Sequence, residues 1–294
     1  METTSMHSGS NEDNKPYIRH PAVAGPYGFY PSKPDVLLND IRSYIDGAEK
    51  YGESKPFGLV SPHAGYVYSG PVAGWAYRQI VDFSYKTVIV ISPSHFVRLQ
   101  KVSVMPAGAY QTPLGNVEID SELASRLVEQ GGEGMELSLN GHLNSGMGSV
   151  EHALEVQLPF LQVVLGDFKL VPIIIGNTGW DLCRQLGRAL AEVVDDDILI
   201  VASSDLSHFH PYKQAMTIDQ NVINAIQAGD GATIAEGCRA GALEACGGTP
   251  IASLLAAAKE NEKTQIEILR HANSGDVPGG SKDQVVGYLA AAVY

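Results

Sequence analysis

Short runs of β-branched and other apolar residues recur along the chain, and each run ends in a polar or glycine-containing loop. Runs such as Val88-Ile89-Val90-Ile91 are apolar at every position, which is typical of strands buried on both faces of a parallel or mixed sheet. Strands are predicted at residues 57–61, 87–92, 170–175, 198–202, 265–269 and 285–293. Residues 102–105, followed by 107–110, predict an added hairpin at the sheet edge.

Segments with helical spacing of apolar residues lie between these strands. Helices are predicted at residues 35–50, 71–81, 121–129, 154–165, 180–194, 216–228 and 250–262. Pro71 and Pro250 indicate helix starts, because proline is tolerated in the first turn, and Thr249 is the expected N-cap of the last helix. Strands that alternate with helices predict an α/β fold, here a three-layer α/β/α sandwich around a mixed, mostly parallel central sheet.

The chain shows no internal repeat and no linker, and the glycine-rich stretch Asn140–Gly148 is interpreted as a loop within a domain. Residues 16–294 are therefore expected to form a single α/β domain. Residues 1–15 are polar and lack the apolar core of a secretory signal, so they are expected to be a disordered tail.

The overall charge and the cysteine content narrow the classes of partner. A formal net charge of −13 repels phosphate groups, which argues against nucleic acid and against anionic membranes as partners. No apolar run reaches the ~20 residues that a membrane span needs. The three cysteines, Cys183, Cys238 and Cys246, form no C-x-x-C pair. An odd number of cysteines argues against a disulfide framework, so a reducing, cytoplasmic location is expected.

Ligands of open α/β sheets gather at the carboxyl ends of the strands, and polar side chains concentrate there in this chain. Histidine follows the first two predicted strands, and an aspartate with a histidine follows the fourth: His63, His95, Asp205 and His208. Cys246 lies just before the helix predicted at 250–262. Each residue alone has an ordinary explanation as a loop, core or helix-start residue, but separate loops that deliver imidazoles to one edge are typical of a metal or acid–base site.

These residue types suit a metal with open coordination positions. His63 and His95 supply imidazole nitrogens, and Cys246, near a helix N-terminus, is expected to have a lowered thiol pKa that favours the thiolate. Glu244 is an alternative third ligand, which would give a set of two histidines and one carboxylate. His208 is expected to act as an acid–base group whose tautomer Asp205 fixes.

Other catalytic templates are absent from the sequence. It contains no G-x-S-x-G, no phosphate-binding G-x-x-x-x-G-K-[ST], no H-E-x-x-H, and no G-x-G-x-x-G after a strand. A serine hydrolase built from Ser203, Asp205 and His208 is disfavoured, because groups so close in sequence converge poorly.

Several motifs together resemble the Memo family, known in prokaryotes as AmmeMemoRadiSam system protein B. They are SPHAGY at 61–66, ISPSH at 91–95, EHALEVQLP at 151–159, SSDLSH at 203–208 and CGGTPI at 246–251. The resemblance runs from about Ala22 to the C-terminus, with the motifs in the family's order.

This resemblance implies a fold similar to that of the class III extradiol dioxygenases, which hold Fe(II) with two histidines and one glutamate. His63 and His95 match the two histidine ligands, Cys246 stands where those enzymes have the glutamate, and His208 matches the acid–base histidine. Asp205 belongs to the same motif as His208. The cysteine departs from the dioxygenase pattern and alters the charge and redox behaviour of the metal.

Two further residues are expected to contact the substrate. The resemblance implies that His152 points into the cleft, as a substrate contact or as support for a metal ligand, and Tyr66 is expected to line the pocket, although an aromatic residue after a strand is more often a packing residue. Glu151 and Glu155 lie one helical turn apart and are otherwise typical of a solvated helix start.

Two functions are consistent with these residues. The first is a metal-dependent oxidoreductase, dioxygenase-like and using Fe(II), with Cu or Zn as alternatives, that acts on a small aromatic or related substrate. The second is a non-catalytic scaffold that binds a metal or a peptide on the same fold.

Overall fold

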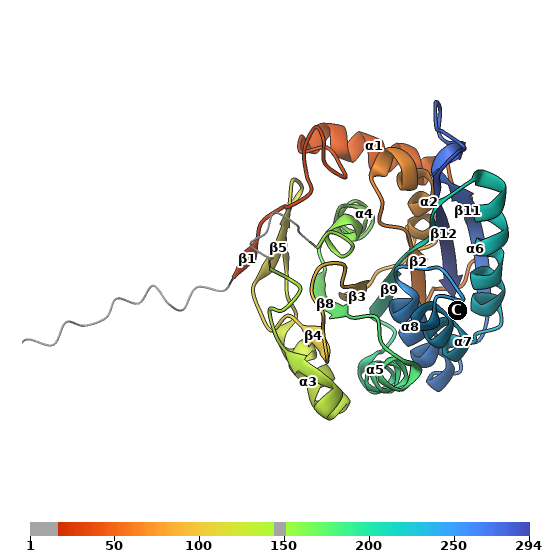
Figure 1. The fold of residues 1–294 in the computed structure, drawn as a ribbon. Helices are drawn as coiled ribbons and strands as arrows, with labels where there is room; N and C mark the ends of the chain where they lie inside the picture. Colours follow the sequence, from red (N-terminus) through yellow and green to blue (C-terminus); the bar gives the residue numbers. More distant parts are fainter. Residues whose placement is uncertain (1–16, 144–150) are drawn as a thin grey trace, which may run out of the picture.

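The computed structural model describes residues 17–143 and 151–294, and its centre is a large mixed sheet (Figure 1). The strand order is β10-β12-β2-β9-β3-β8-β4-β7, with β11 paired to β12. Its strands are β2 (Gly58–Ser61), β3 (Thr87–Pro93), β4 (Val102–Val104), β7 (Met135–Leu137), β8 (Lys169–Ile175), β9 (Ile198–Ser203), β10 (Asp205–His210), β11 (Ile266–Asn273) and β12 (Val285–Val293). Strands β2, β9, β3 and β8 are mutually parallel, and β12 joins them antiparallel.

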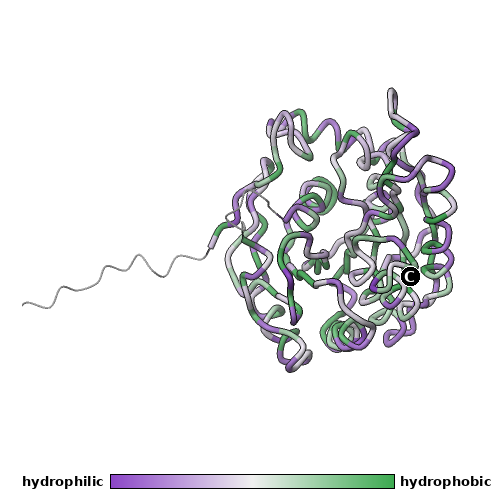
Figure 2. The backbone as a smooth tube through the Cα atoms, in the orientation of Figure 1, coloured by the Kyte–Doolittle hydropathy of each residue, from purple (hydrophilic) through white to green (hydrophobic). Residues whose placement is uncertain are grey.

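The central strands are buried on both faces, as their continuous apolar runs predict. Ile89 and Ile91 of β3 pack in one hydrophobic core, whereas Val88 and Val90 pack in the other, because successive side chains of a strand point to opposite faces. Figure 2 shows hydrophobic segments gathered in the interior strands and mixed with hydrophilic residues along the surrounding helices. Each face of the sheet therefore requires its own cover of helices.

Helices cover both faces of the sheet. They are α1 (Pro34–Asp46), α2 (Tyr66–Arg78), α3 (Ser121–Gly131), α4 (Leu158–Leu165), α5 (Trp180–Val193), α6 (Tyr212–Gln227), α7 (Gly231–Ala240) and α8 (Gly248–Glu260). Helices α1, α2 and α4 contribute to one core, and α3, α5, α6, α7 and α8 contribute to the other. The predicted α/β fold with a mixed central sheet is confirmed, although α7 was not predicted.

The predicted edge hairpin is wrong. Strand β4 belongs to the large sheet, whereas β5 (Ala109–Thr112) lies in a separate sheet with β1 (Ile18–Arg19) and β6 (Gly115–Glu118). The chain changes sheets at Gly108, whose φ is 106° and where a Cβ atom would lie 1.9 Å from the Tyr17 carbonyl oxygen. Glycine permits this close approach to the N-terminal strand.

Two predicted helix starts also need correction. Helix α2 begins at Tyr66, so Pro71 lies at its sixth position rather than at its start. The N-cap of α8 is Gly247, and the Thr249 hydroxyl instead donates to the carbonyl oxygen of Gly176 at 3.2 Å. Pro250 nevertheless falls in the first turn of α8, where the missing N–H has no helical partner to lose.

The tail predicted for residues 1–15 lies outside the described residues, as does most of the loop predicted at 140–148. Across residues 17–143 and 151–294, no helix combines the length and the apolar character needed to cross a membrane.

Candidate metal centre

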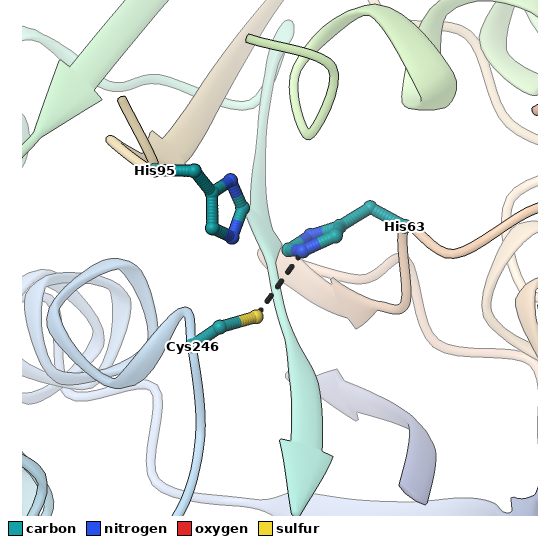
Figure 3. A group of neighbouring side chains, drawn as sticks. All are labelled: His63, His95 and Cys246. Carbon is teal, nitrogen blue, oxygen red and sulfur yellow. Dashed lines mark hydrogen bonds between the residues drawn. The ribbon is translucent and has the colours of Figure 1, made fainter. Parts of the chain in front are cut away.

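Three side chains from distant parts of the chain converge at the carboxyl end of the parallel strands (Figure 3). His63 follows β2, His95 follows β3, and Cys246 precedes α8. The order β2-β9-β3 brings the two histidine loops together, with the end of β9 between them. One ligand atom from each of the three residues lies within 4.8 Å of the others.

The donor set is compatible with one metal ion. Ligand atoms ~2.0–2.3 Å from a single ion are separated from one another by roughly 3–4 Å. Nε2 of His63 and Sγ of Cys246 are 3.1 Å apart, and the two histidine rings are 5.3 Å apart between centroids. Two imidazole nitrogens and a thiol thus converge at one point, and this set of donor types suits Fe, Zn or Cu.

The hydrogen bonds of Ser203 fix the tautomer of His63. Ser203 Oγ donates its one proton to the carbonyl oxygen of Ala153 at 2.6 Å, so it accepts from Nδ1 of His63 at 2.9 Å. Gln157 Nε2 donates a second hydrogen bond to the same hydroxyl oxygen at 2.7 Å. Nε2 of His63 is therefore unprotonated and accepts from the Cys246 thiol at 3.1 Å, and burial lowers the pKa of His63 well below its usual value, which keeps the ring neutral.

Glu151 has the corresponding role for His95. Its Oε1 lies 3.0 Å from Nδ1 of His95, and its Oε2 accepts the His95 backbone N–H at 2.6 Å. Burial alone would lower the pKa of His95, but the hydrogen bond and charge of Glu151 outweigh it and raise that pKa. Burial opposes ionisation of Glu151, yet the bonds from His95 dominate and lower the Glu151 pKa to about 2. The carboxylate orients the ring and leaves Nε2 free for a metal.

Glu151 also belongs to a second group of possible ligands, His95, Glu151 and His152. Oε1 of Glu151 already accepts hydrogen bonds from the ring of His95 and from the backbone N–H groups of His152 and Ala153, and Oε2 accepts the backbone N–H of His95. We therefore assign Glu151 to the support of the first group rather than to a separate metal site.

The expected lowering of the Cys246 pKa is wrong. Burial and the nearby Asp205 carboxylate raise the pKa of this thiol, and they outweigh hydrogen bonds such as that from the Asp205 backbone N–H, 3.3 Å from Sγ.

The turn that carries Cys246 packs closely against the end of β9. A Cβ atom on Gly247 would lie 2.1 Å from the Ser203 carbonyl oxygen, so this position requires glycine.

The comparisons with known proteins agree with these motifs. Residues 19–292 match a family model described as Memo-like protein. The chain belongs to the Memo family. A MEMO1 family protein of Thermotoga maritima is 38% identical to it, over 94% of this chain and 99% of the relative. One from Methanopyrus kandleri is 37% identical, over 92% and 97% of the two chains.

A solved structure also shares the fold. The crystal structure of the uncharacterized protein JW3007 from Escherichia coli K12 superposes with a TM-score of 0.52, covering 80% of this chain and 99% of that one. The sequence identity is 15%, so this likeness shows the fold alone.

In this Memo-family chain, a cleft of about 570 Å³ lies next to the three candidate ligands, which we call the metal group: its lining includes His152, Asp205 and His208 but not His63, His95 or Cys246. His152 stacks on His95, with ring centroids 4.9 Å apart and planes 12° apart. His152 thus lies between the metal group and the cleft. Burial lowers the pKa of His152 to about 4, so its ring is neutral near pH 7.

An irregularity in β10 explains how both Asp205 and His208 line this cleft. Residues three apart on a regular strand point to opposite faces, but the pairing of β10 with β12 shifts register between these two residues. The Asp205 carboxylate accepts the backbone N–H of His63 at 2.8 Å. In the part of the chain that the structure describes, no hydrogen bond joins Asp205 to His208, so the carboxylate supports the His63 loop instead.

Tyr66 and Glu244 lie elsewhere. Tyr66 is buried, donates its hydroxyl to the Val156 carbonyl oxygen at 2.7 Å, and borders a neighbouring pocket rather than this cleft. Glu244 pairs with Nε2 of His210 at 2.8 and 3.0 Å and is not a member of either described ligand group.

The buried residues that support the centre are not among those predicted from the sequence. Glu155 is fully buried and accepts bonds from the guanidinium of Arg19, the hydroxyl of Tyr30 and the backbone N–H of Ala22. Arg19 also donates to the carbonyl oxygen of Glu151 at 2.5 Å. Glu151 and Glu155 are therefore not a solvated helix start. The family motif at 151–159 was the signal that could have indicated their role.

Proposed function

We propose that this Memo-family protein holds one divalent metal ion on His63, His95 and Cys246 and acts as a dioxygenase-like oxidoreductase on a small aromatic substrate. The convergence of the three donor atoms beside a cleft that contains His208 carries this proposal. When bound, the ion would supply Lewis acidity and, as Fe(II), a redox centre.

The chain's own residues prepare the ligands for the ion. Ser203 holds the ring proton of His63 on Nδ1, and Glu151 does the same for His95, so Nε2 of each ring is the nitrogen that would bind the ion. Binding then needs no change of tautomer in either ring, which is the usual contribution of such supporting residues. Cys246 must lose its proton on binding, because the metal-bound form of cysteine is the thiolate.

His208 is the proposed acid–base group. It lines the cleft but belongs to neither described ligand group, so its ring is free to take a proton from a substrate hydroxyl. His152 and the aromatic ring of Phe29, 4.3 Å apart between centroids, line the same cleft and would contact the substrate ring. Asp205 supports the backbone of the His63 loop.

The proposed metal is Fe(II), with Cu and Zn as alternatives. Imidazole ligands suit all three ions, whereas a thiolate shifts preference toward softer ions than a carboxylate does. Metal analysis of protein purified without chelator would identify the resident ion.

Oxygen uptake tests the enzymatic proposal. Protein reconstituted with Fe(II) under anaerobic conditions should consume O₂ when mixed with members of a catechol panel, in proportion to ring-cleaved product. A fully loaded protein that consumes no O₂ with any catechol would refute the oxidoreductase proposal.

A scaffold without turnover is the second candidate, favoured by one observation. Cys246 occupies the position that a glutamate has in the enzymes that this family resembles. The scaffold would bind a metal and a small molecule or peptide, with unchanged ligand recovered after incubation in O₂.

We further infer a cytoplasmic location, which the three free cysteines support. The net charge of −13 supports small molecules or peptides as partners in preference to nucleic acid or a membrane surface.

A further inference from the structure

The cleft beside the metal group has one wall that the proposed chemistry does not use. The connection between β11 and β12 supplies Ser274, residues 277–281 and Gln284 to the lining, and we call this part the β11–β12 wall. Phe29, Tyr68 and Phe209 add aromatic surface to the cleft. A substrate that reached the metal group would place its remaining substituents among these residues.

The cleft lining contains few charged side chains. Asp205 is its one carboxylate, and no lysine or arginine lines the cleft among the residues that the structure describes. The β11–β12 connection does contain a cation, Lys282, but its ammonium lies over the Tyr212 ring, 4.9 Å from the centroid. Arg270 borders a neighbouring pocket and lies over the ring of Trp75, 5.7 Å from the centroid.

The lack of lysine and arginine in the lining makes binding of an anion unfavourable. A carboxylate that leaves water needs a cationic partner or several hydrogen-bond donors, and otherwise its desolvation is unfavourable. The β11–β12 wall offers small, apolar and neutral polar groups such as Val277, Pro278 and Gln284. The Asp205 carboxylate and the overall negative charge add repulsion.

We propose that this cleft selects aromatic substrates whose substituent toward the β11–β12 wall is uncharged or cationic, and that it rejects aromatic carboxylates. This inference rests on the proposed function, because it takes the metal group as the anchor for the substrate hydroxyls. It adds the substrate class, which the metal ligands alone do not determine.

Equilibrium binding to the Zn(II)-loaded protein under nitrogen tests the inference without turnover. The probes are 3,4-dihydroxybenzoate and its methyl ester, which share the ring hydroxyls and differ mainly in charge, together with dopamine as a cationic probe. We expect the ester and dopamine to bind at least about tenfold more tightly than the acid. Equal or tighter binding of the acid would overturn the inference and leave the proposed function intact.

A substitution in the β11–β12 wall separates the effect of the wall on ligand selectivity from the effect of the protein's overall negative charge. Gln284→Lys should tighten binding of 3,4-dihydroxybenzoate by about tenfold and change binding of the ester little, because it places a cation beside the substituent. Gln284→Met, of similar length and without charge, is the matched control. If Gln284→Lys leaves the acid as weakly bound as in the parent, the wall does not set the selectivity and the inference fails.

Failure of the proposed function gives a different result. In that case none of the three probes binds the metal-loaded protein, and the inference falls together with the function on which it rests.

Discussion

Glu151 holds His95 at two points, through the backbone N–H at 2.6 Å and through ring Nδ1 at 3.0 Å. One carboxylate thus fixes both the position of the loop and the orientation of the ring. Glu151 is itself tied down, because its carbonyl oxygen accepts a hydrogen bond from the buried guanidinium of Arg19. The N-terminal strand β1 is in this way connected to a candidate metal ligand.

Replacement of Glu151 should weaken metal binding without removing a ligand. In Glu151→Gln, the amide NH₂ group would face one of the two donors on His95, so one hydrogen bond is lost. We expect a roughly 10–100-fold weaker affinity for Zn(II), measured by competition with a chromophoric chelator. Glu244→Gln, on a carboxylate paired with His210, should retain the parent affinity. Equal affinities in both variants would show that Glu151 does not support a ligand.

Removal of either proposed histidine ligand should abolish stoichiometric metal. We expect His63→Ala and His95→Ala to be purified without bound ion, and His271→Ala to retain it, as measured by elemental analysis. His271 pairs with Oδ2 of the fully buried Asp219 at 3.0 Å, so its loss removes one hydrogen-bond partner of a buried carboxylate and also lowers stability. His20→Ala, at an exposed site, is therefore the cleaner control. Equal metal content in all four variants would show that other residues hold the ion.

The third ligand is tested by a pair of substitutions. Cys246→Ala should lose the metal, whereas Glu244→Ala should keep it, because Glu244 lies against His210 and away from both proposed histidine ligands. A Co(II)-substituted protein gives an independent measurement, since a thiolate ligand adds a charge-transfer band in the near ultraviolet. A band that survives in Cys246→Ala would contradict the assignment.

Much of the site's placement could be predicted, because it depends on a rule that is visible in sequence. Parallel strands end at one sheet edge, so histidines that follow two such strands converge, as His63 and His95 do. The roles of Ser203 and Glu151 could not be predicted in this way, since they depend on hydrogen bonds between segments distant in sequence. The register shift that places both Asp205 and His208 in the cleft is likewise a property of the pairing with β12.

The wrong predictions about the fold also arise from contacts between segments distant in sequence. Residues 102–110 contain two short apolar runs, and their spacing alone suggests a hairpin. The close approach of Gly108 to Tyr17, which sends the second run into another sheet, involves a partner about ninety residues away. The start of α2 was predicted wrongly at Pro71, because local preference places proline in the first turn of a helix. In the structure, tertiary packing extends α2 back to Tyr66.

Stability should fall in mild acid because of a buried histidine remote from the metal ligands. Burial lowers the pKa of His142 from 6.5 to about 3, and both ring nitrogens lie near neutral partners, Tyr110 Oη at 2.7 Å and the Ser103 carbonyl oxygen at 3.3 Å. Since the folded pKa is below the unfolded one, this contribution is complete above pH 6.5 and is lost as pH falls toward 3. We expect a loss of about 1.4 kcal/mol per pH unit.

Urea denaturation at pH 7 and pH 5 measures this loss. His142→Asn should be less stable than the parent at pH 7 but should lose less stability on going to pH 5, because it lacks the titrating ring. An identical pH dependence in parent and variant would contradict the proposed linkage.

His208 provides the sharpest test of the proposed chemistry, because its strand offers a matched control. His208 and His210 both lie on β10, but His208 lines the cleft while His210 pairs with Glu244. The irregular part of β10 is held from behind, where the buried Asp219 accepts the backbone N–H of Ser207 at 3.0 Å. Replacement of either histidine by alanine leaves that support in place, so both variants should fold and bind metal as the parent does.

The two variants should differ in turnover. Loss of a general acid–base group costs roughly 10²–10⁴ in rate, so His208→Ala should lose most of the O₂ uptake with catechols, whereas His210→Ala should retain it. Loss of metal in His208→Ala would instead make His208 a ligand and undercut the assignment of Cys246. Retained metal with undiminished turnover would make His208 a structural residue, and the likeness to dioxygenase chemistry would lose its main support.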